Sequence, residues 1–168
     1  MKVRKKDGTW KEIIYSSEQL YKYGINRLSE REFGSKELFK KMQRLQPESE
    51  IITAVIEKLK AQGYLSDERR ANSMFRQFDK NEGIGKIKQR MALKGLDKDL
   101  IRSVIESHKE FSEDGSEVEK ALGLIVKKYK QYAPELNQKI YRFLVSKGFD
   151  SESSQKAIKR FKDNTVEF

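Results

Sequence analysis

The feature of the sequence that most constrains its fold is a pattern of apolar residues that recurs three times at helical spacing. Equivalent places in the three copies hold these groups: Leu38, Ile87 and Ile140; Met42, Met91 and Leu144; Val55, Val104 and Ala157; Ile56, Ile105 and Ile158. Within each copy the spacing is typical of one face of an amphipathic helix. Each such face needs a partner to cover it, so the pattern predicts an all-α chain of three tandem units.

The turn between the two matched helices supports the repeat. Gly95-Leu96-Asp97 and Gly148-Phe149-Asp150 each combine a glycine that can close one helix with an aspartate that can cap the next. The first copy has Gln46-Pro47-Glu48 instead, and we expect it to reach the same geometry with a proline start. Any two short amphipathic helices can look alike, but agreement of spacing, turn and cap favours a true repeat.

Start and stop signals predict nine helices of about 10 to 16 residues, in three repeats of three helices. We expect Gly63, Gly95 and Gly148 to close helices in the left-handed conformation, and Pro47 and Pro134 to occupy first turns. Ser116 and Glu119 form a capping-box pattern. The predicted divisions are a tail or small hairpin at 1–17 and repeats at 18–62, 63–110 and 111–168.

Charge and composition limit the class of partner. The chain has 36 Lys and Arg against 26 Asp and Glu, a formal charge of +10, which favours nucleic acid, an acidic protein surface or an anionic membrane, or is simply solvated. There are no cysteines, so disulfides are excluded and a cytoplasmic setting is expected. The longest apolar run, residues 121–126, is too short to span a membrane, so we expect a soluble protein.

Catalytic patterns are lacking. His108 is the one histidine, and we expect it to act as a cation at the end of the sixth helix. Gly83-Ile84-Gly85-Lys86 has the wrong spacing for a nucleotide-binding P-loop, and we expect a tight helix start that could touch a DNA phosphate. The sequence therefore predicts no enzyme, no cofactor and no metal site.

One stretch of the chain is similar to the signature of the RecX family. It reads Gly63-Tyr64-Leu65-Ser66-Asp67-Glu68-Arg69-Arg70-Ala71, then Phe75-Arg76, then Gly83-Ile84-Gly85-Lys86-Ile87, then Lys94-Gly95-Leu96-Asp97. The motif residues that carry the resemblance are Gly63, Tyr64, Leu65, Asp67, Arg69, Ala71, Gly83 and Gly95. Ser66 stands where the family has an acid and Arg70 where it has an aromatic residue, so an apolar contact beneath the fourth helix is missing or is supplied by Phe75.

The resemblance implies an elongated, curved helical-repeat protein, and we expect the chain to be a monomer. It implies that the chain binds RecA, lies along the groove of the RecA–DNA filament, and restrains the ATPase, strand-exchange and co-protease activities of RecA. Two other functions stay open from the residues alone. One is a direct DNA-binding helical module, and the other is a helical scaffold for a different acidic protein.

Basic residues at helical spacing are the candidate contacts for a RecA or DNA partner. They form a row on each of three equivalent helices: Lys36, Lys40 and Arg44; Lys86, Arg90 and Lys94; and, more loosely, Lys139, Arg142 and Lys147, with Arg76 as a further candidate. Residues spaced by four share one helix face. Repeated on equivalent helices, such rows would give a repeat protein a charged stripe for an extended partner, or would be no more than a solvated face.

Overall fold

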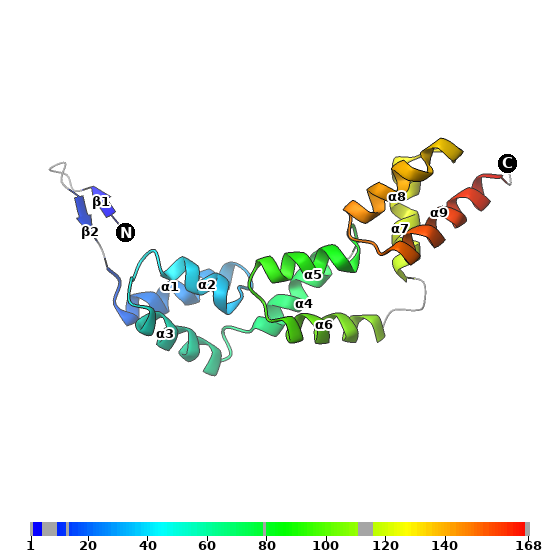
Figure 1. The fold of residues 1–168 in the computed structure, drawn as a ribbon. Helices are drawn as coiled ribbons and strands as arrows, with labels where there is room; N and C mark the ends of the chain where they lie inside the picture. The colour runs from blue at the N-terminus through cyan, green and yellow to red at the C-terminus, as the bar shows by residue number, and fades with distance from the viewer. Residues whose placement is uncertain (1, 5–9, 13, 79, 111–115, 167–168) are drawn as a thin grey trace. The chain divides into compact units, whose positions relative to one another are not determined.

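The structure is a computed structural model of the chain that describes residues 2–4, 10–12, 14–78, 80–110 and 116–166. A two-stranded antiparallel hairpin, β1 (Lys2–Arg4) and β2 (Trp10–Glu12), stands before the first helix (Figure 1). Its strands are in register with Val3 opposite Lys11. Of the two alternatives for the start of the chain, the structure has the hairpin, while residues 5–9 lie outside the described residues.

Nine α-helices follow in the described part of the chain, and the predicted all-α repeat architecture is confirmed. Their bounds are α1 (Ser17–Glu30), α2 (Ser35–Met42), α3 (Ser49–Ala61), α4 (Asp67–Phe78), α5 (Ile84–Leu93), α6 (Lys98–Glu110), α7 (Ser116–Lys128), α8 (Asn137–Ser146) and α9 (Ser151–Val166). A short 3-10 helix, η1 (Pro134–Leu136), precedes α8. None of the described helices is long and apolar enough to cross a membrane.

The chain divides into two compact units. The first holds Met1–Ala71 together with Lys94–Leu96, and the second holds Asn72–Leu93 together with Asp97–Phe168. The start of α4 and the turn between α5 and α6 therefore belong to the same unit as α1, α2 and α3. Each unit contains buried apolar side chains at the positions that the repeat pattern aligned.

The aligned apolar residues form the interior of the helical repeats. Ile87, Ile140 and Leu38 have no exposed surface, and neither do Met42, Met91 and Leu144. Among the remaining aligned positions only Ile158 is half-buried rather than buried. The core of the first repeat is completed by Leu20 of α1 and that of the third by Ile125 of α7, because the first helix of each supplies a third apolar face.

The glycine stops are confirmed, since Gly63, Gly95 and Gly148 have φ angles of 75°, 82° and 90°. Pro134 begins η1 as expected, but Pro47 does not begin a helix, because α3 starts two residues later at Ser49. In the first repeat, the turn between α2 and α3 is held by a buried glutamine and not by a residue in the left-handed conformation. The side-chain amide of Gln46 donates to the carbonyl of Tyr15 (2.9 Å), and its oxygen accepts from the backbone N–H of Glu48 (3.1 Å).

Candidate partner-binding surface and the joints between repeats

The basic row of the first repeat is exposed, and no acid among the described residues pairs with it. Lys36 and Lys40 lie on α2, and Arg44 follows the end of that helix. None of the three is in an ion pair within the described part of the chain. The stem of Lys36 packs on Gly95, where an added Cβ would lie 3.0 Å from the Lys36 Cβ. Lys40 and Arg44 therefore keep their charged ends available to a partner.

The predicted row Lys86, Arg90 and Lys94 is engaged inside the protein at two of its three positions. Arg90 donates two hydrogen bonds to the buried Glu82 (2.6 and 2.7 Å), and its guanidinium lies 4.6 Å from the centre of the Phe78 ring. Lys94 follows the end of α5 and pairs with Glu37 (3.5 Å). Lys86 is half-buried. These carboxylates reduce the positive charge that this row offers to a partner.

The third row resembles the first. Lys139 and Arg142 of α8 are exposed, and neither is in an ion pair among the described residues. Lys147, half-buried after the end of the helix, lies over the Phe143 ring at 5.9 Å, and Lys128 of α7 lies over the same ring at 4.0 Å. Arg76 of α4 is also exposed and without an ion pair in this part of the chain.

The motif residues at the start of the second repeat hold the backbone in place. Gly63 closes α3, while Leu65 and Ala71 are buried. Arg69 donates to the carbonyls of Gly63 (2.8 Å) and Tyr64 (2.9 Å) and pairs with Glu32 (3.0 Å). Tyr64 itself leaves half of its surface exposed, so its ring is open to a partner.

Asp67 and Glu117 have the same role in successive repeats. Asp67, in the first turn of α4, accepts from the backbone N–H of Ser35 (2.7 Å) and from its hydroxyl (2.6 Å). Glu117, in the first turn of α7, accepts from the N–H of Ile84 (3.3 Å). In both cases an acid at the start of one repeat satisfies a free N–H of a helix in the preceding repeat. Sequence reasoning missed this role because the paired residues are more than 30 positions apart.

Three glycines lie at a close backbone contact between the second and third repeats. The N–H of Gly83 donates to the carbonyl of Lys147 (2.9 Å), and that of Gly85 to the carbonyl of Gly148 (3.0 Å). A Cβ at Gly83 would come within 2.5 Å of the Gly148 backbone. The expectation that this helix start touches a DNA phosphate is therefore corrected, because its N–H groups are already bonded within the protein.

Arg70, the departure from the family pattern, is buried beside Glu37. Glu37 accepts a hydrogen bond from Arg31 (2.8 Å) and lies 3.4 Å from Arg70 and 3.5 Å from Lys94. Burial disfavours the Glu37 carboxylate, but the bond from Arg31 and the charges of Arg70 and Lys94 hold its pKa below the usual value. Where the family has an aromatic residue, this chain therefore has one half of a buried ion pair.

His108 has a packing role. It lies in the last turn of α6, where its ring stacks on Phe75 with centres 4.0 Å apart, and its Nε2 is 2.9 Å from Asn72 Oδ1. His108 is at the predicted place near the end of α6, and its ring is half-buried there. No group of three or more His, Cys, Asp or Glu residues that could hold a metal occurs in the described ranges.

Comparison with known proteins identifies relatives over most of the chain. The family model described as "RecX, third three-helix domain" matches residues 116–158. The chain is 32% identical over 139 residues to Regulatory protein RecX of Haemophilus influenzae (strain PittEE), covering 79% of this chain and 88% of that protein. It is 31% identical over 132 residues to Regulatory protein RecX of Clostridium perfringens (strain 13 / Type A), covering 77% of this chain and 62% of the relative.

A solved structure has the same fold. The crystal structure of RecX from Lactobacillus salivarius superimposes with a TM-score of 0.75 and 23% sequence identity, over 88% of this chain and 97% of the other. The three-helix description of the matching family model agrees with the composition of the third repeat from α7, α8 and α9.

Proposed function

Because this chain belongs to the RecX family of regulatory proteins, we propose that it binds RecA and the RecA–DNA filament and mainly inhibits RecA. The activities expected to fall are ATP hydrolysis, strand exchange and the co-protease function. The observation that carries the proposal is the match to curated RecX regulatory proteins over 79% of the chain. The proposed role needs no catalytic group, in keeping with a regulatory protein.

The unpaired basic residues are the proposed contacts for the filament. Lys36, Lys40 and Arg44 in the first repeat, and Lys139 and Arg142 in the third, are exposed and have no ion pair in the described ranges. Arg90 and Lys94 already neutralise Glu82 and Glu37. A carboxylate or phosphate of the partner would therefore gain more from the first and third rows than from the second. Arg76 and Lys86 complete the proposed set.

Co-sedimentation with RecA filaments tests the proposed partnership. RecA is assembled on single-stranded DNA with a slowly hydrolysed ATP analogue, and the purified chain is added before centrifugation. We expect the chain to pellet with the filaments in saturable amounts, and to stay in solution with an equal amount of naked DNA. Recovery that depends on DNA alone would contradict the proposal.

Direct binding to DNA is the second candidate, and the charge of +10 is the observation that favours it. Affinity from phosphate contacts falls steeply with salt, by about three to five orders of magnitude between low and physiological salt for extensive contacts. A DNA module therefore predicts tight binding to naked duplex that is lost as salt is raised. Weak binding at every salt concentration would remove this candidate. A pull-down that recovers an acidic protein other than RecA would favour the scaffold alternative.

A further inference from the structure

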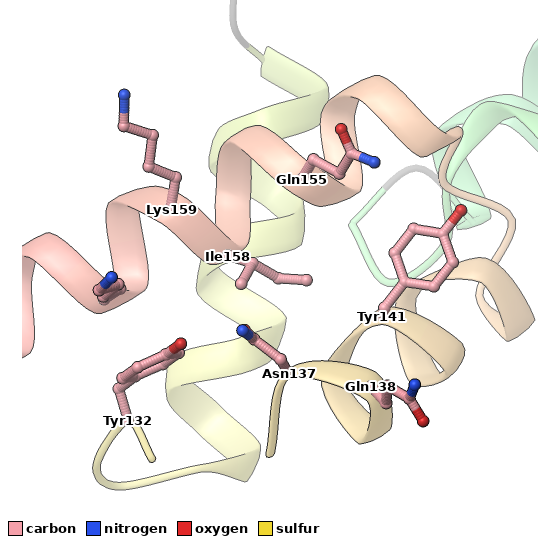
Figure 2. Close-up of a pocket in the computed structure, with 8 residues that line it drawn as sticks. Tyr132, Asn137, Gln138, Tyr141, Gln155, Ile158 and Lys159 are labelled. Atoms are coloured by element: carbon pink, nitrogen blue, oxygen red, sulfur yellow. The ribbon is translucent and has the colours of Figure 1, made fainter. Parts of the chain in front are cut away.

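The third repeat contains a pocket that the proposed function does not use. It has a volume of about 400 Å³ and lies between α8, α9 and the segment before α8 (Figure 2). Ile158, half-buried against the core of the repeat, is an apolar part of its lining. Pockets for small molecules span roughly 300 to 1,000 Å³. This one is of the size for a single compact ligand and is too small for a helix.

Two tyrosines of the pocket are held by contacts with the rest of the repeat. The Tyr132 ring meets Phe161 edge to face, with centres 6.3 Å apart, and the Tyr141 hydroxyl donates to Ser151 Oγ (3.2 Å). In Figure 2 the two rings flank Ile158. Side chains that are already fixed lose little freedom when a ligand binds. The pocket therefore offers prearranged aromatic surfaces to a flat ring.

The charged side chains that line the pocket are both lysines among the described residues. Lys159 and Lys162 of α9 line it, and no carboxylate does among the described residues. Neither lysine is in an ion pair in the same part of the chain, whereas Lys156 and Arg160 on the same helix pair with Glu152 (2.6 Å) and Glu119. An anionic group bound beside Ile158 would meet two cations without displacing an internal partner.

Three carboxamides complete the lining. Asn137, Gln138 and Gln155 are exposed and make no side-chain hydrogen bond within the described part of the chain. Each can donate and accept, as the edge of a nucleic-acid base does. Aromatic side chains bind bases by stacking, worth about 1 to 3 kcal/mol per base. The rings thus match the face of a base, the carboxamides match its edge, and the lysines match the phosphate.

We infer that this pocket binds one nucleotide, with its base against the tyrosines and its phosphate beside Lys159 and Lys162. The same chemistry is present in a free nucleotide and in a nucleotide of a single strand. An acidic peptide would satisfy the lysines but would leave the aromatic surfaces and carboxamides without a matching ring. The inference does not depend on RecA binding, and a chain with an empty pocket can still pellet with RecA filaments.

Two-dimensional amide NMR of the full chain tests the inference with four probes. AMP should shift amides of residues 137–141 and 155–162 in a saturable manner, and inorganic phosphate should bind about tenfold more weakly, because it lacks the stacking base. A thymidine tetranucleotide that competes with AMP would identify a strand as the source, and one that does not bind would identify a free nucleotide. The inference would be overturned if neither AMP nor the tetranucleotide gave a saturable shift. It would also be overturned if phosphate bound as tightly as AMP, or if tetraglutamate bound and AMP did not.

Matched substitutions separate the pocket from general charge attraction. Lys159→Gln should weaken AMP binding about fivefold, as expected for loss of one exposed charge contact. Lys156→Gln removes a lysine from the same helix that is paired with Glu152, and should leave the AMP affinity within about twofold. Tyr141→Leu should weaken AMP while leaving phosphate binding unchanged. Equal losses in the two lysine variants would show nonspecific attraction and overturn the inference.

Discussion

At the scale of the single residue, Glu37 has three positively charged neighbours among the described residues. Its side chain is 11% exposed and that of Arg70 is 9% exposed, whereas Arg31 and Lys94 are about half exposed at 45% and 49%. A buried charge that loses its partner is costly, while a pair on the surface contributes little. Most of the energy of this cluster therefore lies in the pair between Glu37 and Arg70. The sequence showed that Arg70 replaces an aromatic residue, but it could not show which acid, 33 positions earlier, would accept the charge.

Replacing Glu37 by Gln should destabilise the folded chain by about 2 kcal/mol or more, because Arg70 would remain buried without a counter-charge. Urea unfolding followed by circular dichroism measures the change. The double variant Glu37→Gln with Arg70→Met should recover much of the loss, since it removes both buried charges. A loss below about 0.5 kcal/mol for the single variant, the range of an ordinary surface change, would contradict the importance of this pair.

The free energy of unfolding should also depend on pH through the Glu37 carboxylate. The folded-state pKa of Glu37 is lowered from its ordinary value of 4.5, so the unfolded chain takes up the proton first as the pH falls. The stability that the carboxylate contributes is therefore full above pH 4.5 and declines as the pH falls through the folded-state pKa. We expect the difference in unfolding free energy between the wild type and Glu37→Gln to shrink on acidification. A difference that does not change between neutral and strongly acidic pH would contradict the assignment.

At the level of the elements, the helices and their ends could be predicted from the sequence more completely than the contacts between repeats. Gly63, Gly95 and Gly148 were identifiable because closing a helix in the left-handed conformation is a local requirement that glycine meets best. The prediction that Pro47 begins a helix was wrong, because a proline can also stand before the residue that caps a helix. The buried Gln46, which organises this turn, bonds to Tyr15, far away in the sequence. The contacts of Gly83 with Lys147 and of Arg90 with Glu82 depend on tertiary structure, so spacing alone could not reveal them.

Two glycines with the same backbone conformation but different surroundings give a matched prediction. Gly63 has open space where a Cβ would lie, whereas a Cβ at Gly148 would lie 2.3 Å from the Lys86 nitrogen. Gly63→Ala should cost about 1 to 2 kcal/mol from backbone strain alone. Gly148→Ala should cost about 2 kcal/mol more, because the backbone of α5 must move away to relieve the overlap.

Thermal and urea unfolding of the two alanine variants measure this difference. The Gly148→Ala variant should also lose amide-exchange protection at Gly83 and Gly85, whose N–H groups donate to the 147–148 turn. Equal destabilisation, with protection at Gly83 and Gly85 retained, would contradict the close contact between the second and third repeats.

At the scale of the whole molecule, the RecX relatives indicate a regulatory protein, and the chain combines nine described helices with an excess of ten positive charges. The fold could be predicted from the apolar repeat alone. The choice of basic contacts could not, because Lys94 and Lys40 are both lysines on equivalent helical rows, yet only Lys94 is paired with a carboxylate in the described part of the chain. Ion pairing within the protein therefore distinguishes basic residues that the sequence pattern cannot distinguish as partner contacts.

The proposed contact in the first repeat predicts a difference between two double variants. Lys40→Gln with Arg44→Gln removes two unpaired charges, whereas Lys22→Gln with Lys60→Gln removes two charges paired with Glu18 and Glu57 in the same repeat. The first variant should bind RecA filaments about tenfold to thirtyfold more weakly, as expected for two charge contacts of about 1 kcal/mol each. The second should bind within about threefold of the wild type. Equal weakening in co-sedimentation would show that only net charge matters.

Hydrolysis of ATP by RecA on single-stranded DNA tests the proposed inhibition of RecA most directly. The purified chain is added in increasing amounts up to one molecule per RecA, and phosphate release is followed with time. We expect the rate to fall in a dose-dependent manner, and we expect Lys40→Gln with Arg44→Gln to inhibit less than Lys22→Gln with Lys60→Gln. An unchanged rate of ATP hydrolysis at stoichiometric amounts of the folded wild-type chain would contradict the proposed inhibition.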